Sequence, residues 1–304
     1  MPVRSLLHYA LEVPDQAAGQ RYYQDFGLVD VGGSGEAVGL RAPRQSRPNL
    51  LLYGGPRKRL HHLCFGASGE DFARVRASLR DNGVREVDAP RGAPEGGLWV
   101  RDPDGHLVNV RDEAPDVAPV DVPPPMNGPG YTPRQAVRGC PERGQGAAPR
   151  RLGHVLLFSP DLKRQMDFYV GVLGLRLSDR SGDMIAFMRC STDHHNVALL
   201  ASSAPGFHHA SFQVGSVDEI ATGAARMADR GWQPGWGLGC HVIGSNFFYH
   251  IRDPWGSFAE YFYDLDSIPE DCAWAARDFP AEDSLYLWGP PVPPDFAENK
   301  EAAA

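Results

Sequence analysis

The second half of this sequence repeats the first. Three landmarks recur in the same order and at similar spacing: LLHYALEVPD (6–15) with LGHVLLFSPD (152–161), RLHHLCFG (59–66) with GFHHASFQ (206–213), and WVRDPDGHLVNV (99–110) with HIRDPWGSFAEY (250–261). An ordered series of matches at a fixed offset is the signature of an internal duplication. We therefore predict two copies of one domain, which also suits a chain of 304 residues.

Each copy reads as a strand, a helix and further strands, twice over. Residues 71–82 and 217–230 are the clearest predicted helices, because each is followed by a glycine and Ser216 is suited to cap the second. Short runs rich in Val, Leu, Ile and Phe, such as residues 154–158 and 246–251, have the length and composition of strands.

The composition predicts four segments. We expect an N-terminal domain over residues 1–112 and a C-terminal domain over residues 150–268. Between them, residues 113–149 are rich in Pro, Gly and Arg and are predicted to form a linker. Residues 269–304, again rich in proline, are predicted to wrap over the second domain.

Charge and cysteine content exclude several classes of protein. The net charge of −8 argues against nucleic acid as a partner, because phosphate binding needs a cationic surface. No segment approaches the roughly 20 consecutive apolar residues of a membrane span, and the N-terminus does not resemble a signal peptide. The five cysteines are scattered and form no CxxC pair, so neither a disulfide framework nor a thiolate zinc site is indicated. We expect a cytoplasmic protein.

The second copy carries a set of metal-binding residue types at its three landmarks. His154, His209 and Glu260 all fall on predicted strands at equivalent depth in the repeat. Two imidazoles and one carboxylate form the facial triad that holds Fe(II) and leaves neighbouring coordination positions open. The first copy has His8 and His62 at the matching places but Asn109 in place of the glutamate, and a neutral amide lacks the charge that helps to hold a divalent cation. We predict a metal in the second copy alone.

Four segments resemble the two-domain extradiol ring-cleavage dioxygenases of the vicinal oxygen chelate superfamily: residues 153–183, 193–199, 205–214 and 239–262. The resemblance spans nearly the whole chain. It implies an α+β fold of four βαβββ modules, arranged as two tandem half-barrels. It also implies Fe(II), occasionally Mn(II), in the C-terminal half-barrel, bound by His154, His209 and Glu260.

By the same resemblance, His195 matches the histidine beside the bound dioxygen, and His241 matches one that hydrogen-bonds the substrate region. An imidazole can take up and release protons near neutral pH, as deprotonation of a catechol requires. One position departs from the family, which usually has a tyrosine ten residues before the glutamate ligand. Here His250 occupies that position and the tyrosine is Tyr249. Because adjacent strand residues face opposite ways, only one of the two points into the half-barrel unless the strand bulges.

The predicted function is extradiol cleavage of a catecholic ring with O2, in a homo-oligomer that binds neither nucleic acid nor membrane. Either His250 takes over the tyrosine's hydrogen bond, or the chemistry or substrate has changed, and we favour retained ring cleavage. One alternative keeps the fold and metal but acts on a hydroquinone or a specialised-metabolism catechol. Another is a metal-free resistance protein that only binds an aromatic ligand.

Several other residues are expected to be structural. His208 precedes His209 and is predicted to be a structural or pocket-rim residue, and of the pair at 194 and 195 we expect His195 rather than His194 to be catalytic. The run from Asp253 to Gly256 is predicted to be a turn. His61, His62 and His106 of the first copy are predicted to be packing or surface residues. The core is the default expectation for Phe187, Met188, Phe248 and the aromatics of the tail, and the sequence leaves open whether some of them line an apolar pocket.

Overall fold

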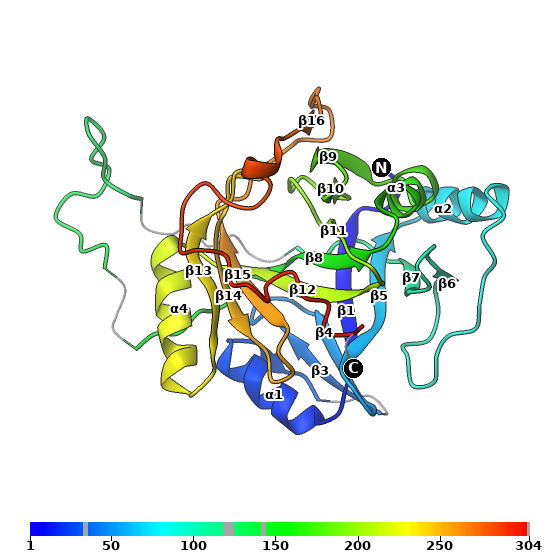
Figure 1. Cartoon of the computed structure of the whole chain (residues 1–304), viewed down its shortest axis with the longest axis horizontal. Helices are drawn as coiled ribbons and strands as arrows, with labels where there is room; N and C mark the ends of the chain where they lie inside the picture. Colours follow the sequence, from blue (N-terminus) through cyan, green and yellow to red (C-terminus); the bar gives the residue numbers. More distant parts are fainter. Residues whose placement is uncertain (33–35, 118–124, 141–143, 303–304) are drawn as a thin grey trace.

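A computed structural model describes residues 1–32, 36–117, 125–140 and 144–302. Each half of the chain forms one mixed sheet (Figure 1). The first has seven strands in the order β2-β3-β4-β1-β5-β7-β6. Its elements are β1 (Ser5–Val13), α1 (Gln16–Asp25), β2 (Val29–Asp30), β3 (Ala37–Arg41), β4 (Leu50–Gly54), β5 (Arg59–Ala67), α2 (Glu70–Asp81), β6 (Leu98–Arg101) and β7 (Leu107–Asp112).

The second half forms a nine-stranded sheet in the order β13-β14-β15-β12-β8-β11-β10-β9-β16. Seven of these strands repeat the order of the first sheet, and β13 adds an eighth beside β14. The ninth, β16, comes from the C-terminal segment and pairs with β9. The elements are β8 (Arg151–Ser159), α3 (Leu162–Met166), η1 (Asp167–Val172), β9 (Arg176–Ser181), β10 (Ile185–Arg189), β11 (Val197–Ala201), β12 (Gly206–Gln213), α4 (Val217–Asp229), β13 (Pro234–Cys240), β14 (Phe247–Arg252), β15 (Phe258–Tyr263), β16 (Arg277–Asp278) and the 3₁₀ turn η2 (Ala281–Asp283).

This arrangement confirms the α+β class and the duplicated plan of strand, helix and three strands. One module departs from it. Between α2 and β6 the chain makes only an isolated bridge, from Glu86 to Val100, where the other modules have a strand. Residues 90–97 include Pro90, Pro94 and three glycines, which favour irregular backbone over a ladder.

The two clearest predicted helices lie where the sequence puts them. Helix α4 begins after Ser216, whose hydroxyl accepts a hydrogen bond from the Glu219 amide at 3.1 Å. Helix α2 starts one residue before the predicted boundary and is followed by Gly83 at φ +67°. A left-handed glycine just past the last turn satisfies the free carbonyls of a helix end.

The second copy has one residue more than the first between its Pro-Asp and Gly-Leu landmarks. Asp15 to Gly27 in the first copy corresponds to Asp161 to Gly174 in the second. In the structure the second copy has a short α-helix, α3, that continues directly into a π-helical turn over Asp167–Val172. Because a π turn holds an extra residue without moving the flanking turns, the insertion leaves the neighbouring strands in register.

The two halves pack through reciprocal contacts of their first helices. Tyr22 of α1 donates to the carbonyl of Ile251 in the second sheet at 3.0 Å, and Phe26 stacks on Tyr261 at 3.9 Å. In return, Tyr169 of the π turn donates to Asp102 in the first half at 3.2 Å. Buried side chains of both halves belong to one continuous core.

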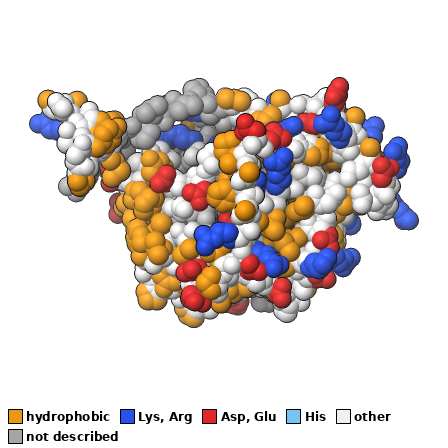
Figure 2. Space-filling view, turned by 90° about the horizontal axis from the view of Figure 1, so that it is seen from above, with side chains coloured by type: hydrophobic (Ala, Val, Ile, Leu, Met, Phe, Trp, Pro, Cys, Tyr) orange, Lys and Arg blue, Asp and Glu red, His pale blue; other side chains and the backbone are white. Residues whose placement is uncertain are grey.

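The C-terminal segment crosses the second sheet and ends against the first half (Figure 1). Near its end the Glu301 carboxylate accepts from the Leu60 amide at 2.8 Å, so the segment touches both halves. Residues 125–140 project from the body, where Met126, Tyr131 and Val137 are exposed (Figure 2). Among the described residues, none of the helices has the length and apolarity that a membrane crossing requires.

Candidate metal centre and active site

Three neighbouring strands bring the predicted ligands together. Ser211 of β12 lies opposite His154 of β8 on one side and opposite Glu260 of β15 on the other. Directly paired residues share one face of a sheet, and His209 joins that face from two residues earlier in β12. The ligand atoms of His154, His209 and Glu260 all lie within 4.8 Å of one another.

The donor set fits a divalent cation. The Oε2 atom of Glu260 lies 3.1 Å from His154 Nε2 and 3.3 Å from His209 Nε2. Within the described part of the chain, His209 Nε2 and both Glu260 carboxylate oxygens are buried without a hydrogen-bond partner. Buried polar atoms are rarely left so, and a cation bound among them would satisfy all three.

Electrostatics favour the protonation states that metal binding needs. Burial alone raises the pKa of Glu260, but His250, His154, His209 and His241 around it outweigh that effect and hold the pKa well below its usual range. Burial also lowers the pKa of His209, although the Glu260 carboxylate partly opposes the shift. An ionised carboxylate and a neutral imidazole are the forms that coordinate a metal.

His195 lies beside the ligand cluster with two further polar groups behind it. Its ring centroid is 4.3 Å from that of His154, and its Nδ1 is 3.1 Å from Nδ1 of His194. The other nitrogen of His194 lies 2.8 Å from Asp179, whose second oxygen accepts from the Arg277 amide at 2.6 Å. Burial, followed by the neighbouring His154 and His194, lowers the pKa of His195 well below its usual value.

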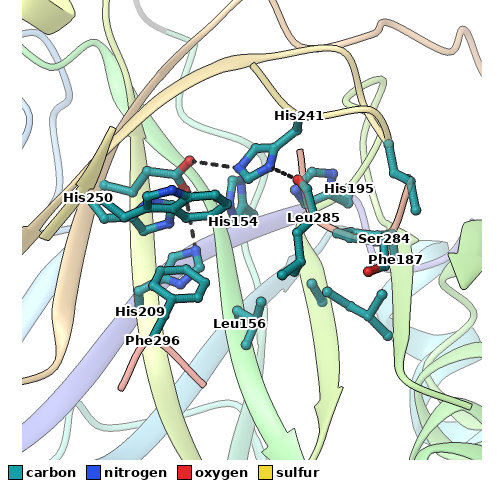
Figure 3. Close-up of a pocket in the computed structure, with 15 residues that line it drawn as sticks. His154, Leu156, Phe187, His195, His209, His241, His250, Ser284, Leu285 and Phe296 are labelled. Carbon is teal, nitrogen blue, oxygen red and sulfur yellow. Dashed lines mark hydrogen bonds and ion pairs between the residues drawn. The ribbon is translucent and has the colours of Figure 1, made fainter. Parts of the chain in front are cut away.

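His241 and His250 complete the ring of histidines around the carboxylate (Figure 3). His241 Nε2 is 3.7 Å from Glu260 Oε1, and its Nδ1 hydrogen-bonds the carbonyl of Leu285. His250 pairs directly with Glu260 across β14 and β15, and its Nε2 is 3.9 Å from Oε2. Its ring is stacked against Trp236. The structure thus gathers all six predicted site residues around one pocket.

Strand alternation decides which of Tyr249 and His250 faces the pocket. The pairing of β14 with β15 runs without a bulge, so these two residues face opposite ways. His250 is buried and lines the pocket, whereas Tyr249 is half-buried and does not line it.

The matching position in the first half is closed by its own side chains. His8 Nε2 and His62 Nε2 lie 3.0 Å apart, within hydrogen-bonding distance. The Asn109 amide donates to the carbonyls of Gly96 and Leu98, each at 3.3 Å. Among the described residues, these side chains do not form a metal-capable group of three.

Comparison with known proteins places the chain in a family. Residues 151–261 match the family model of the Glyoxalase/Bleomycin resistance protein/Dioxygenase superfamily. Metapyrocatechase 2 of Cupriavidus necator is 47% identical over 304 residues, covering 99% of this chain and 93% of that protein. The iron-dependent extradiol dioxygenase of Rhodococcus jostii strain RHA1 is 29% identical over 153 residues, covering 45% of this chain and 50% of that protein.

The chain belongs to the two-domain extradiol dioxygenases. A solved structure with the same fold is the Mn(II)-bound glyoxalase from Novosphingobium aromaticivorans, with a TM-score of 0.80 at 27% identity. It covers 97% of this chain, and this chain covers 94% of it. Iron and manganese thus both occur in the names of its relatives.

The pocket of this extradiol dioxygenase has apolar walls that the sequence identified only in part. Phe187, expected to be core by default, lines the pocket, as does Phe296 of the tail. The sequence predicts no site role for the remaining wall residues, which are Leu156, Ile185, Ala198, Trp236, Ile243, Ser284 and Leu285. Strand alternation carries a signal for some of them, since Leu156 lies two residues after His154 in β8.

The residues expected to be structural agree with that expectation. His194 and His208 are buried behind the second histidine of each pair and do not line the pocket. Asp253 accepts from the amides of Trp255 and Ser257 and so closes the predicted turn, in which Gly256 has φ +85°.

Proposed function

We propose that this protein cleaves a catecholic ring beside its diol, adding both atoms of O2 and giving a muconic semialdehyde-type product. The observation that carries the proposal is the convergence of His154, His209 and Glu260 in one buried pocket. The name metapyrocatechase, carried by a relative with 47% identity over almost the full length, supports a catechol as substrate.

We assign His154, His209 and Glu260 as the ligands of an Fe(II) ion. Bound by these residues, such an ion would supply a shared binding position for diol and O2 and a route for electron density between them. Two imidazoles and one carboxylate favour Fe(II), although Mn(II) accepts the same donors. Metal analysis of protein purified without added metal distinguishes the two.

His195 is proposed to accept a proton from the diol. Because burial lowers its pKa, the ring is neutral at neutral pH and has a free lone pair. Its ring lies beside that of His154, with the centroids 4.3 Å apart, and so borders the ligand cluster.

His241 and His250 are proposed to orient the substrate. The Leu285 carbonyl fixes the ring of His241 through Nδ1 and leaves Nε2 directed at the pocket. His250 stands where the family usually has tyrosine, and we assign it the hydrogen bond to a substrate oxygen. Of the described residues that line the pocket, none is lysine or arginine, which favours a ring without a charged substituent.

Oxygen uptake and metal content test the proposal together. Protein purified anaerobically and loaded with Fe(II) is mixed with catechol, 3-methylcatechol, 2,3-dihydroxybiphenyl and hydroquinone in turn. We expect stoichiometric O2 consumption and a yellow product with at least one catechol. Turnover of hydroquinone alone would favour the alternative substrate class. A protein that binds aromatic rings without metal or O2 uptake would instead be a binding protein.

A homo-oligomeric state and a cytoplasmic location stay predictions. Light scattering coupled to size-exclusion chromatography measures the first. The second agrees with the cysteines Cys64, Cys140, Cys190, Cys240 and Cys272 being free.

A further inference from the structure

The three His-His pairs of the chain share one unusual contact. In each pair the Nδ1 atoms of the two neighbouring rings lie within hydrogen-bonding distance: 2.7 Å in 61–62, 3.1 Å in 194–195 and 2.6 Å in 208–209. Regular strand alternation would turn such neighbours to opposite faces. In β12 a register shift between Phe207 and His209 relaxes that alternation, so His208 packs directly behind His209.

The proton on His208 is fixed by the C-terminal segment. Its Nε2 lies 2.7 Å from the backbone carbonyl of Phe296. A carbonyl oxygen only accepts, so Nε2 must carry the hydrogen. The ring is buried among Phe158, Phe258 and Phe296, and among the described residues it pairs with no carboxylate that would stabilise a charge, so it has one proton. Its Nδ1 is therefore bare and can only accept.

The same reasoning then fixes His209. Because Nδ1 of His208 accepts, Nδ1 of His209 must donate, and the neutral ring of His209 has no proton left for Nε2. That bare Nε2 is the atom 3.3 Å from Glu260 Oε2, buried and without a hydrogen-bond partner among the described residues. Only a nitrogen without a proton can bind a metal.

We propose that His208 is a positioning residue: by donating to the Phe296 carbonyl it holds His209 in the tautomer whose Nε2 faces the metal. The inference rests on the proposed role of His209 as a ligand. It makes the end of the chain part of the metal site, although no tail side chain belongs to the ligand set. In the first half His62 Nε2 contacts His8 instead, so His61 supports no equivalent site.

The first test is the affinity of the metal-free, full-length protein for Mn²⁺, measured by calorimetry. His208→Phe keeps an aromatic ring among Phe158, Phe258 and Phe296 but removes both hydrogen bonds. We expect it to weaken Mn²⁺ binding about 10- to 100-fold, the usual effect of losing a partner behind a metal ligand. His208→Asn, whose carbonyl oxygen still accepts from His209, should restore most of the affinity. His61→Phe, the matched change in the first half, should leave it unchanged.

The second test reads the tautomer directly, and its deciding measurement needs no variant of His208. In ¹⁵N spectra of the metal-free wild-type protein, with signals assigned through His209→Gln, we expect His209 to be protonated at Nδ1 and bare at Nε2. His208→Phe should show a mixture of tautomers.

The outcomes distinguish an error in the metal site from an error in the role assigned to His208. If Glu260→Ala binds Mn²⁺ as tightly as wild type, the metal site itself is wrong. If Glu260→Ala loses binding while His208→Phe matches His61→Phe, the metal site stands and the tautomer role is overturned. A wild-type spectrum with His209 protonated at Nε2 also overturns it, and this measurement decides the matter even if His208→Phe does not fold.

Discussion

The two halves of the molecule place histidines at the same strand positions and use them differently. In the first half His8 and His62 hydrogen-bond each other, and Asn109 turns its amide to backbone carbonyls. In the second half His154 and His209 both face Glu260, whose oxygens have no hydrogen-bond partner within the described residues. A carboxylate can only accept, whereas an amide satisfies itself on the backbone. This side chain is therefore one difference between the packed site of the first half and the binding site of the second.

A second difference lies at the residue directly paired with that side chain. Trp99 pairs with Asn109, and His250 pairs with Glu260. Both rings meet the neighbouring histidine edge-on: Trp99 lies 5.0 Å from His62, and His250 lies 4.8 Å from His209. Both halves therefore place an aromatic ring at this position, and only in the second half is that ring an imidazole, which can accept as well as donate.

Glu260→Gln should have the largest effect, because it gives the second half the neutral amide of the first. Loss of a residue that supports a metal ligand typically reduces activity about 10- to 100-fold. Loss of the ligand itself should have a larger effect, so we expect kcat to fall by more than about 100-fold. Oxygen uptake with catechol measures it. Asn109→Ala, the matched change, should leave kcat unchanged; equal losses in both variants would mean that the first half also takes part.

Asn109→Glu tests the reverse exchange. The new carboxylate would face the carbonyls of Gly96 and Leu98 and would lose the amide's two donated hydrogen bonds. We expect the free energy of unfolding to fall by about 1 to 3 kcal/mol, as for other buried polar groups left without a partner. Urea denaturation measures this. Metal content should remain one ion per chain, and a second bound ion would show that charge alone separates the two halves.

His250→Tyr restores the side chain that the family usually has at this position. If His250 has taken over the hydrogen bond to substrate, kcat should change by about tenfold, the worth of one ordinary hydrogen bond of about 1.4 kcal/mol. Steady-state kinetics on the same catechols test this. Wild-type turnover and substrate preference in the variant would show that the exchange is inconsequential.

His8→Leu should change the acid stability of the first half. Burial lowers the pKa of His8 from 6.5 to about 3. Between these values the unfolded chain binds a proton that the folded chain does not, so stability is complete above pH 6.5 and falls as the pH drops towards 3. Removing this histidine should reduce the slope of unfolding free energy against pH by about 1 kcal/mol per unit. Denaturation series at pH 6.5 and 4.5 measure it, and an unchanged slope would contradict the assigned shift.

The repeat explains how much of this could be predicted from the sequence. Aligning the two copies identifies His154, His209 and Glu260 without any knowledge of the fold, because equivalent positions in a duplicated sheet face the same way. The contact of His208 with His209 could not be predicted, since it depends on a register shift that alternation does not reveal. Leu285 could not be predicted, because the tail has no counterpart in the first copy and no periodicity of its own, and for Phe296 the sequence left core and pocket wall open.

The position of these wall residues after the ligand-bearing strands has a consequence for how the protein is made. Synthesis finishes the three strands at Tyr263, and Leu285 and Phe296 follow later in the chain. A chain still on the ribosome, or one trimmed by a protease before Leu285, has all its ligands but lacks their cover. A metal ion could reach the ligands of such a chain before Leu285 and Phe296 take their places in the pocket wall.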